Sequence, residues 1–429
     1  RAPAPPAEFD VEWLGSTGAS AAYQFSPGPA DTLVRFRVTR VRGTLPVALT
    51  LVGSTGWLSA PSTVRVSRAV DTITLVQHPP RLPGAYSASV RAEAAGVSGP
   101  LFILVSTVVV PAVARVGPVR SGGMLGAGHL RRVFFPADSG RPFRVRIATV
   151  SAREHLTAAL HQPGGAPILG DNGIPGSADS AAAVFDVEAR DALPGFYEAD
   201  AVASSDRPVT ASIQVDPSPL GVLLAGGPGD SIAITLRSFV DSTVSGRLDL
   251  GVIGGERRFD VSATGSDDLA IPFRLPGWAR RLVVDLELDP AQWSRFTDLG
   301  FTARDAVGRI LGKSPANYAR ARLTADLPAG ASDQDATIVL APAFAEPGSR
   351  ERWSARVTLR VEAARPNAIA TEGGDEFTLP AGRSRVLRGR LGDFPWSLPA
   401  GFEPLTILIA ESGGISWGWR IPLAGVPKG

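Results

Sequence analysis

The feature that most constrains the fold of this chain is an alternation of apolar and polar residues in short segments between Gly- and Pro-containing turns. Residues 86–93 (YSASVRAE) carry an apolar or aromatic side chain at every even position and a polar one at every odd position. A period of two places these sets on opposite faces of an extended chain and predicts a half-buried β-strand. After a Gly-Pro break at 99–100, the apolar run 101–110 is too short to span a bilayer and predicts a strand covered on both faces.

The same pattern recurs at close intervals from the start of the chain. Short strands are predicted over 9–13, 33–38, 47–52, 63–66 and 72–76. This spacing is typical of a β-sandwich of the immunoglobulin or fibronectin-III type, which we expect over residues 9–116 after a Pro-rich linker at 1–8. Trp57 fits either a core aromatic or an exposed binding residue.

Two further regions repeat the alternation. The string LPGAYSASV at 82–90 returns as LPGFYEADAV at 193–202, and a second sandwich over 117–217 that closes in a similar way is the simplest explanation. Residues 218–429 are predicted to form one large sandwich or two small ones with a split near 290.

Helical periodicity is scarce. Residues 299–310 and 316–323 fit short helices, but they also fit strands, and we expect at most a few helical turns. The chain is therefore predicted to be all-β, built from tandem β-sandwiches with little helix.

Composition and charge exclude several classes of function. The chain has 43 basic and 41 acidic residues, for a net charge of +2, and contains no cysteine. A disulfide, a thiolate metal site and a cysteine nucleophile are thereby excluded. Arginines alternate with apolar residues at Arg35 and Arg37, Arg144 and Arg146, and Arg356 and Arg360. This pattern predicts solvated sheet faces, so we expect no nucleic-acid partner, and no apolar run is long enough to predict a membrane span.

The first residue is Arg1 rather than Met, and no apolar signal core follows it. We expect the chain to be an excised or processed piece of a longer protein, reached through the Pro-rich linker from an upstream domain.

Candidate catalytic residues lack the partners that their chemistry needs. The four histidines, His78, His129, His155 and His161, show no HExxH spacing and are predicted to be surface or boundary residues. Residues 138–140 (DSG) match the tripeptide around the subtilisin aspartate, but no histidine or serine motif of that class follows, which favours a turn. We assign no catalytic residue.

Candidate binding motifs are similarly weak. The Gly-rich stretch 226–230 lacks P-loop and dinucleotide spacing and predicts a hairpin turn. Residues 171–173 and 266–268 offer oxygens without the ligand spacing of a calcium loop, so no cofactor or metal residue is assigned and calcium stays an open alternative. Trp417 and Trp419 alternate on one strand face, which fits core or interface packing better than a sugar-stacking platform.

Several short motifs occur in a fixed order along the chain. They are the Trp turn at 57–61, GAY at 84–86, GPLF at 99–102, GHLRR at 128–132 with FFP at 134–136, Trp293 with Thr297 and Asp298, PANY at 315–318, and VPKG at 426–429. This series resembles the β-rich region that follows the catalytic domain in the tripeptidyl-peptidase II family of subtilisin-like serine peptidases. Residues 103–105 and 217–290 depart from that pattern. The strings LPGFYEADAV and RPVTASIQV also resemble the pre-peptidase C-terminal jelly roll of secreted bacterial proteases.

The resemblance implies a non-catalytic accessory region whose catalytic Asp, His and Ser lie in an upstream domain. Its β-domains would pack on that peptidase domain in cis and contribute to homo-oligomer contacts. The alternative is a secreted or surface carbohydrate-binding or adhesion protein without a peptidase domain. Eukaryotic members of the family are cytosolic, whereas the jelly-roll resemblance and the Lys-poor composition favour a secreted bacterial protein. The reading frame upstream of Arg1 would separate these alternatives.

Overall fold

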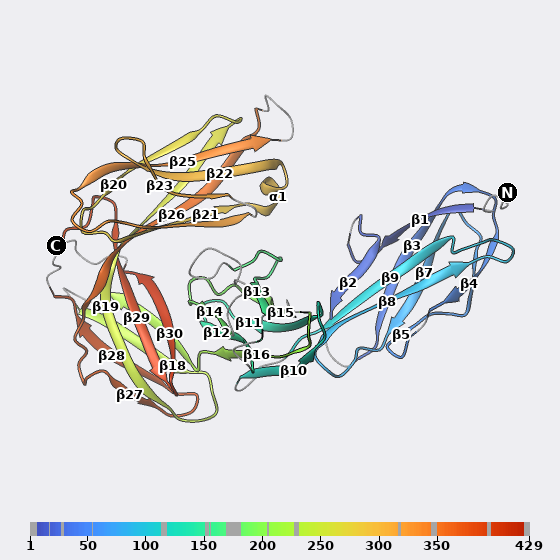
Figure 1. The fold of residues 1–429 in the computed structure, drawn as a ribbon, viewed down its shortest axis with the longest axis horizontal. Coiled ribbons are helices and arrows are strands. Elements are labelled where there is room, and N and C mark those ends of the chain that lie inside the picture. Colours follow the sequence, from blue (N-terminus) through green and yellow to red (C-terminus); the bar gives the residue numbers. More distant parts are fainter. Residues whose placement is uncertain are drawn as a thin grey trace. The chain divides into compact units, whose positions relative to one another are not determined.

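The computed structural model describes residues 7–16, 18–26, 30–53, 55–112, 118–150, 154, 156–168, 182–203, 206–226, 231–315, 319–344, 350–392 and 396–423. All described elements are β-strands except the four-residue helix α1 (Pro290–Trp293), which confirms the all-β prediction (Figure 1). Within the described residues, no helix is long and apolar enough to cross a membrane.

Packing divides the chain into two compact units. Unit 1 comprises Arg1–Ala137, Val145–Phe185 and Pro194–Asp216, and unit 2 comprises Asp138–Arg144, Asp186–Leu193 and Pro217–Gly429.

Nine strands at the start of unit 1 form a β-sandwich. They are β1 (Ala7–Trp13), β2 (Ala21–Phe25), β3 (Thr32–Gly43), β4 (Val47–Val52), β5 (Leu58–Ser59), β6 (Thr63–Val66), β7 (Val70–Gln77), β8 (Gly84–Glu93) and β9 (Phe102–Val110). One sheet has the order β1-β3-β7-β5 and the other β2-β9-β8-β4-β6, with β2 parallel to β9. Phe36, Leu49 and Leu104 are among the buried side chains of its core.

Of two strand predictions for this sandwich, one is confirmed and one is partly wrong. Residues 86–93 lie in β8 and alternate in burial as predicted. The expectation that residues 101–110 are covered on both faces is wrong for the first half of β9, where Ile103 and Val105 are 45% and 36% exposed, and correct near its end, where the adjacent Val108 and Val109 are both buried. Phe102 and Leu104 alternate with the two exposed residues and face the core, so the first half of β9 has one covered face. Trp57 is half-buried against the core, with its ring centroid 6.4 Å from that of Tyr86.

The next seven strands form two more sheets. They are β10 (Val119–Leu125), β11 (Leu130–Ala137), β12 (Phe143–Thr149), β13 (Leu156–His161), β14 (Ala182–Val187), β15 (Gly195–Ala203) and β16 (Val209–Pro217). Their orders are β10-β16-β12-β14 and β11-β15-β13. The stacked rings of Phe135 and Tyr197, 5.7 Å apart, join neighbouring strands of the second sheet on its buried face.

Fourteen further strands and α1 make up most of unit 2. They are β17 (Leu220–Gly226), β18 (Ser231–Ser238), β19 (Val244–Thr264), β20 (Leu269–Leu275), β21 (Arg281–Leu288), β22 (Phe296–Asp305), β23 (Ile310–Pro315), β24 (Arg320–Asp326), β25 (Gln334–Phe344), β26 (Arg352–Ala368), β27 (Glu376–Leu379), β28 (Ser384–Arg390), β29 (Glu403–Ser412) and β30 (Ile415–Pro422). A seven-stranded sheet of order β24-β21-β26-β19-β29-β30, with β27 on β19, packs against the sheets β20-β25-β22-β23 and β17-β18-β28.

The 21-residue strand β19 joins the two cores of unit 2. Leu248 and Leu250 enter the core that holds Trp417 and Trp419, while Phe259 packs on the other. Between these ends the register with β26 shifts at Gly254, where an added Cβ would lie 1.9 Å from the carbonyl oxygen of Val361. Glycine therefore permits the close approach that lets one strand serve both cores.

Two ambiguous predictions for unit 2 are resolved by the fold. Residues 299–310 lie in β22, in the turn after it and at the start of β23, and residues 320–323 lie in β24, so the strand reading applies there. Residues 316–318 are outside the described residues. Trp417 and Trp419 are 6% and 1% exposed, which agrees with core packing and leaves neither ring available to stack on a sugar.

Candidate functional site

The motifs with a possible catalytic meaning lie apart from one another on turns. His129 is exposed in the turn before β11. Asp138 is also in a turn, closed by Gly140 at a φ of +74°, and its carboxylate lies 3.6 Å from the Arg141 guanidinium, so the turn reading of 138–140 is confirmed. Residues 266–268 are exposed in the turn after β19. His155, 171–173 and 227–230 fall outside the described residues.

His78 makes contacts that resemble part of a serine-protease triad. Its Nδ1 lies 2.7 Å from Asp31 Oδ1 and its Nε2 lies 3.3 Å from Ser59 Oγ. In a working triad the carboxylate is buried, which lets it orient the imidazole and stabilise its charged form. The Asp31 and His78 side chains are 60% and 44% exposed, so this is a hydrogen-bonded surface histidine, as predicted.

A second histidine, His161, lies in a polar cluster of unit 1. Its Nδ1 is 3.3 Å from Asp200 Oδ2, and Glu198 lies beside both. In the register of β13 and β15, His161 pairs with Glu198, and Asp200 follows two residues later on the same face. The prediction of a boundary histidine holds, because the side chain is 28% exposed. Its two acidic neighbours, Glu198 and Asp200, were not predicted, although their i, i+2 spacing is visible in LPGFYEADAV.

The pKa of one carboxyl group in this cluster, that of Asp200, is raised. Burial and the nearby charge of Glu198 raise the pKa of Asp200 to about 7, and Arg132 only partly opposes them. Arg132 Nε lies 3.2 Å from Glu198 but 4.0 Å from Asp200. Two carboxylates thus share one neighbouring cation.

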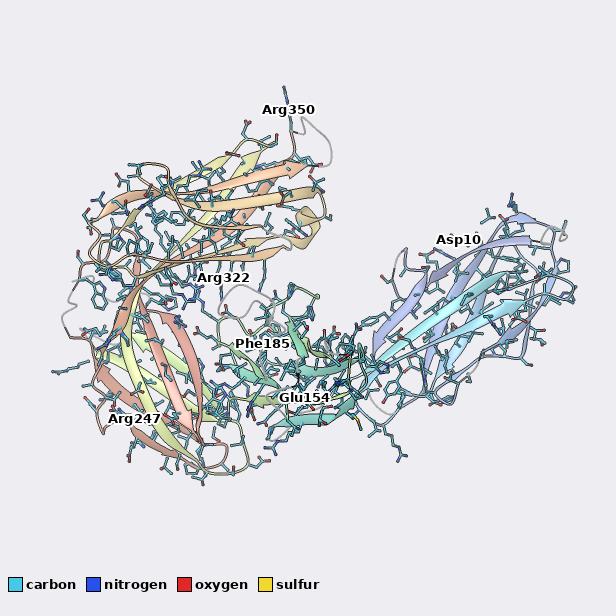
Figure 2. The ribbon with its side chains drawn as sticks, viewed as in Figure 1. Asp10, Glu154, Phe185, Arg247, Arg322 and Arg350 are labelled. Atoms are coloured by element: carbon cyan, nitrogen blue, oxygen red, sulfur yellow. The ribbon has the colours of Figure 1, made fainter. Side chains whose placement is uncertain are left out.

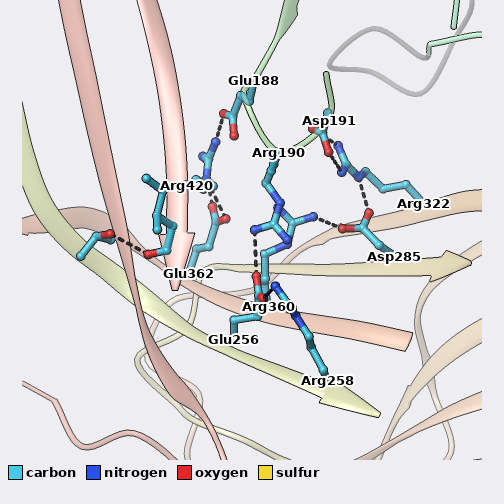
Figure 3. A network of polar contacts seen from close by, with 12 residues as sticks. Glu188, Arg190, Asp191, Glu256, Arg258, Asp285, Arg322, Arg360, Glu362 and Arg420 are labelled. Carbon is cyan, nitrogen blue, oxygen red and sulfur yellow. Dashed lines mark hydrogen bonds and ion pairs between the residues drawn. The ribbon is translucent and has the colours of Figure 1, made fainter. Parts of the chain in front are cut away.

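A more extended polar site is an ion-pair network in unit 2 (Figure 3). It covers the face of β24, β21, β26 and β19 opposite to the core, because its residues alternate with core residues such as Leu323 and Leu359. The segment Asp186–Leu193, which starts in the last two residues of β14, supplies Glu188, Arg190 and Asp191 to the network.

The first branch of the network runs through Arg322, which is labelled in Figure 2. Arg322 donates to both carboxylate oxygens of Asp191 at 2.9 and 2.6 Å, and its Nε donates to Asp285 Oδ1 at 2.5 Å. Arg360, which is 3% exposed, donates to the other oxygen of Asp285. Bidentate pairs of this kind hold both partners in one orientation.

Two more branches connect the segment Asp186–Leu193 to the sheet. Arg190 Nη1 donates to Glu256 Oε2 at 2.8 Å, and Glu256 is 2% exposed. Arg420 on β30 pairs with Glu188 and, with Nε–Oε1 at 3.0 Å, with Glu362 on β26. Three charged residues of one short segment are therefore each tied to a different part of unit 2.

The buried charges of the network depend on one another. Burial opposes ionisation of Asp285, but Arg322 and Arg360 outweigh it and lower the pKa of this carboxyl to about 2. Burial raises the pKa of Glu362 despite the attraction of Arg360. The prediction that Arg356 and Arg360 lie on a solvated face is correct for Arg356, at 56% exposure, and wrong for Arg360, because the segment Asp186–Leu193 and its partners cover that end of the face.

This network has the properties of a structural cross-link. Its arginines and carboxylates neutralise each other in pairs, and each of these contacts joins two elements of unit 2. Its chemistry is to fix the positions of strands and of one connecting segment.

Comparison with known proteins shows a likeness of fold. No protein-family model and no curated protein sequence matches the chain. The crystal structure of tripeptidyl peptidase 2 (TPP II) superposes with a TM-score of 0.50 at 12% identity and covers 99% of this chain and 41% of that one. The chain thus spans about two-fifths of the length of that protein. At this identity the likeness shows a shared β-rich fold, in line with the resemblance inferred from the motifs.

Other solved structures are much less similar. A Clostridium perfringens protein with an M60 catalytic domain and two CBM51 domains has a TM-score of 0.17 at 8% identity, covering 84% of this chain and 51% of that one. The BSP domain of a biofilm-associated protein has a TM-score of 0.15 at 7% identity, covering 98% and 97%. Neither superposition carries a functional argument.

Proposed function

We propose that this chain is the non-catalytic accessory β-sandwich region of a subtilisin-like serine exopeptidase that resembles tripeptidyl-peptidase II. The observation that carries the proposal is the superposition on TPP II, which extends over 99% of the chain although the two sequences are only 12% identical. In this role the chain stabilises an upstream catalytic domain and contributes to contacts between copies of the whole protein.

The construction of unit 2 supports a scaffolding role. Its two cores share β19, and the ion-pair network adds Glu188, Arg190 and Asp191 as three separate anchors for one connecting segment. A carrier of a neighbouring domain benefits from such rigidity, because a fixed surface loses little conformational entropy when another domain packs on it.

The test is to produce the chain together with the polypeptide encoded directly upstream of it, and to compare this longer protein with each part alone. We expect peptide hydrolysis from the longer protein, none from the 429-residue chain, and a lower thermal midpoint for the catalytic part without the chain. Sedimentation velocity on the same proteins should show a larger assembly for the longer protein than for its catalytic part. Hydrolysis by the isolated chain, or an upstream polypeptide without a subtilisin triad, would overturn the proposal.

A further inference from the structure

We propose that His161, Glu198 and Asp200 form a site for one zinc-type divalent cation on the outer face of the sheet β11-β15-β13 in unit 1. The ligand atoms of these three residues lie within 4.8 Å of one another. This inference is independent of the accessory role proposed above.

The backbone register places the three side chains together. His161 on β13 pairs directly with Glu198 on β15, and Asp200 is two residues further along the same face. Arg132 on β11 pairs with Asp200 from the other side. The ligands therefore stand on two adjacent hydrogen-bonded strands, which hold a metal site more accurately than loops do.

Two polar atoms of this cluster are buried without a well-aligned hydrogen bond. Asp200 is 8% exposed, its Oδ1 has no hydrogen-bond partner among the described residues, and His161 Nδ1 has only the 3.3 Å contact with Asp200 Oδ2, which is not aligned as a hydrogen bond. Buried polar atoms are nearly always hydrogen-bonded, because leaving one unpaired costs about 1–3 kcal/mol as a general rule. A cation between them would satisfy both atoms.

The distances suit zinc. Ligand bonds of about 2.0–2.2 Å in a tetrahedral site place neighbouring ligand atoms roughly 3.4 Å apart. His161 Nδ1 and Asp200 Oδ2 are 3.3 Å apart. Glu198 has a longer side chain that is 24% exposed, and rotation of its carboxylate brings the third ligand onto the same ion.

The ligand types and the charge balance select the metal. An imidazole nitrogen with two carboxylates favours zinc over calcium and magnesium, which prefer oxygen ligands alone. The two carboxylates face one cation, Arg132, so a divalent ion would replace their mutual repulsion with attraction. Arg132 would remain as an outer partner that orients Glu198.

The ion would tie β13, at the edge of its sheet, to the central strand β15. On the same face of β15, Phe196 stacks on Phe25 of β2, with ring centroids 4.2 Å apart. Tyr23, also on β2, interacts electrostatically with Glu198 and Arg132. Metal binding would thus stabilise the part of unit 1 where the first sandwich meets this sheet.

The experiment is a titration of the purified 429-residue chain with Co²⁺, followed by the visible absorption of tetrahedral cobalt and by displacement with Zn²⁺. We expect one equivalent of cobalt per chain and a higher thermal midpoint in Zn²⁺. His161→Ala and Glu198→Gln should each abolish the cobalt band and the thermal shift. His129→Ala, at an exposed histidine outside the cluster, should leave both unchanged.

Circular dichroism of each variant shows whether it is folded. If His161→Ala does not fold, Glu198→Gln decides the question, because this side chain is partly exposed and keeps its shape. The proposal is overturned if the wild-type chain binds no stoichiometric cobalt, or if a folded Glu198→Gln variant binds it as the wild type does.

Discussion

Replacing Asp285 with asparagine tests whether the ion-pair network holds unit 2 together. The substitution keeps the size of the side chain and removes the charge shared by Arg322 and Arg360. Lowering the pKa of Asp285 from 3.8 to about 2 corresponds to about 2 kcal/mol in favour of the charged form in the folded protein. Breaking a buried pair costs at most about 5 kcal/mol in general. We therefore expect Asp285→Asn to lower the free energy of unfolding of unit 2 by about 2–5 kcal/mol at pH 7.

The sign of the pH dependence follows from the direction of the pKa change. Because the pKa of Asp285 is lowered in the folded protein, its charge stabilises the fold above pH 3.8, and this contribution is lost as the pH falls from 3.8 toward 2. Wild type and Asp285→Asn should therefore differ most near neutral pH and converge in acid.

Urea unfolding monitored by tryptophan fluorescence provides the measurement. Of the eight tryptophans only Trp13 and Trp57 belong to unit 1, so the signal reports mainly on unit 2. Asp260→Asn is the matched control. Asp260 on β19 also forms an ion pair with an arginine of β26, Arg356, but its side chain is 81% exposed. Exposed pairs contribute about 0–1 kcal/mol. A stabilising role for the charge of Asp285 is refuted if Asp285→Asn lowers the free energy of unfolding no more than this control at pH 7, or if its effect does not shrink in acid.

Three further outcomes are expected. Gly254→Ala should lower the free energy of unfolding of unit 2 by about 1–3 kcal/mol, because the added Cβ would collide with a backbone oxygen of β26. Gly300→Ala is the control and should be tolerated, since an added Cβ would meet no atom within 4 Å. Equal urea midpoints for the two variants would contradict this prediction. Trp353→Phe should cost about 1–3 kcal/mol, since the buried indole donates to a backbone oxygen at 3.1 Å, and an unchanged thermal midpoint would argue otherwise. A fluorophosphonate probe should not label Ser59, because the neighbouring His78 is solvated; mass-spectrometric detection of that adduct would show that the exposed triad-like contacts are reactive.

The strands were largely predictable because burial alternates between neighbouring residues. The alternation in 86–93 and the Pro-Gly turns at 82–84 and 193–195 correspond to the entry and length of β8 and to the start of β15. The same local pattern could not decide between helix and strand for 299–310. This segment is extended because β22 forms hydrogen bonds with β25 and β23.

The polar sites were much less predictable. A charged residue on the outer face of a strand has the same sequence signature whether water or protein covers it. Arg360 is covered because Glu188, Arg190 and Asp191, about 170 positions earlier in the chain, pack over its end of the sheet. The sequence contains the alternation but not the identity of the covering segment.

The cluster on β13 and β15 was also only partly predictable from the sequence. The acidic i, i+2 pair of Glu198 and Asp200 is visible in the sequence, and His161 is one of four histidines without any motif. Only the antiparallel register of β13 and β15 sets this histidine opposite Glu198.

The sequence by itself determined the all-β class, most strand positions and the turns, because each depends on residues within a few positions of one another. The tertiary structure alone decided which strands pair, that β19 serves two cores, and which charges are buried. These properties depend on strand register and on contacts between distant segments, which a period of two along one strand does not encode.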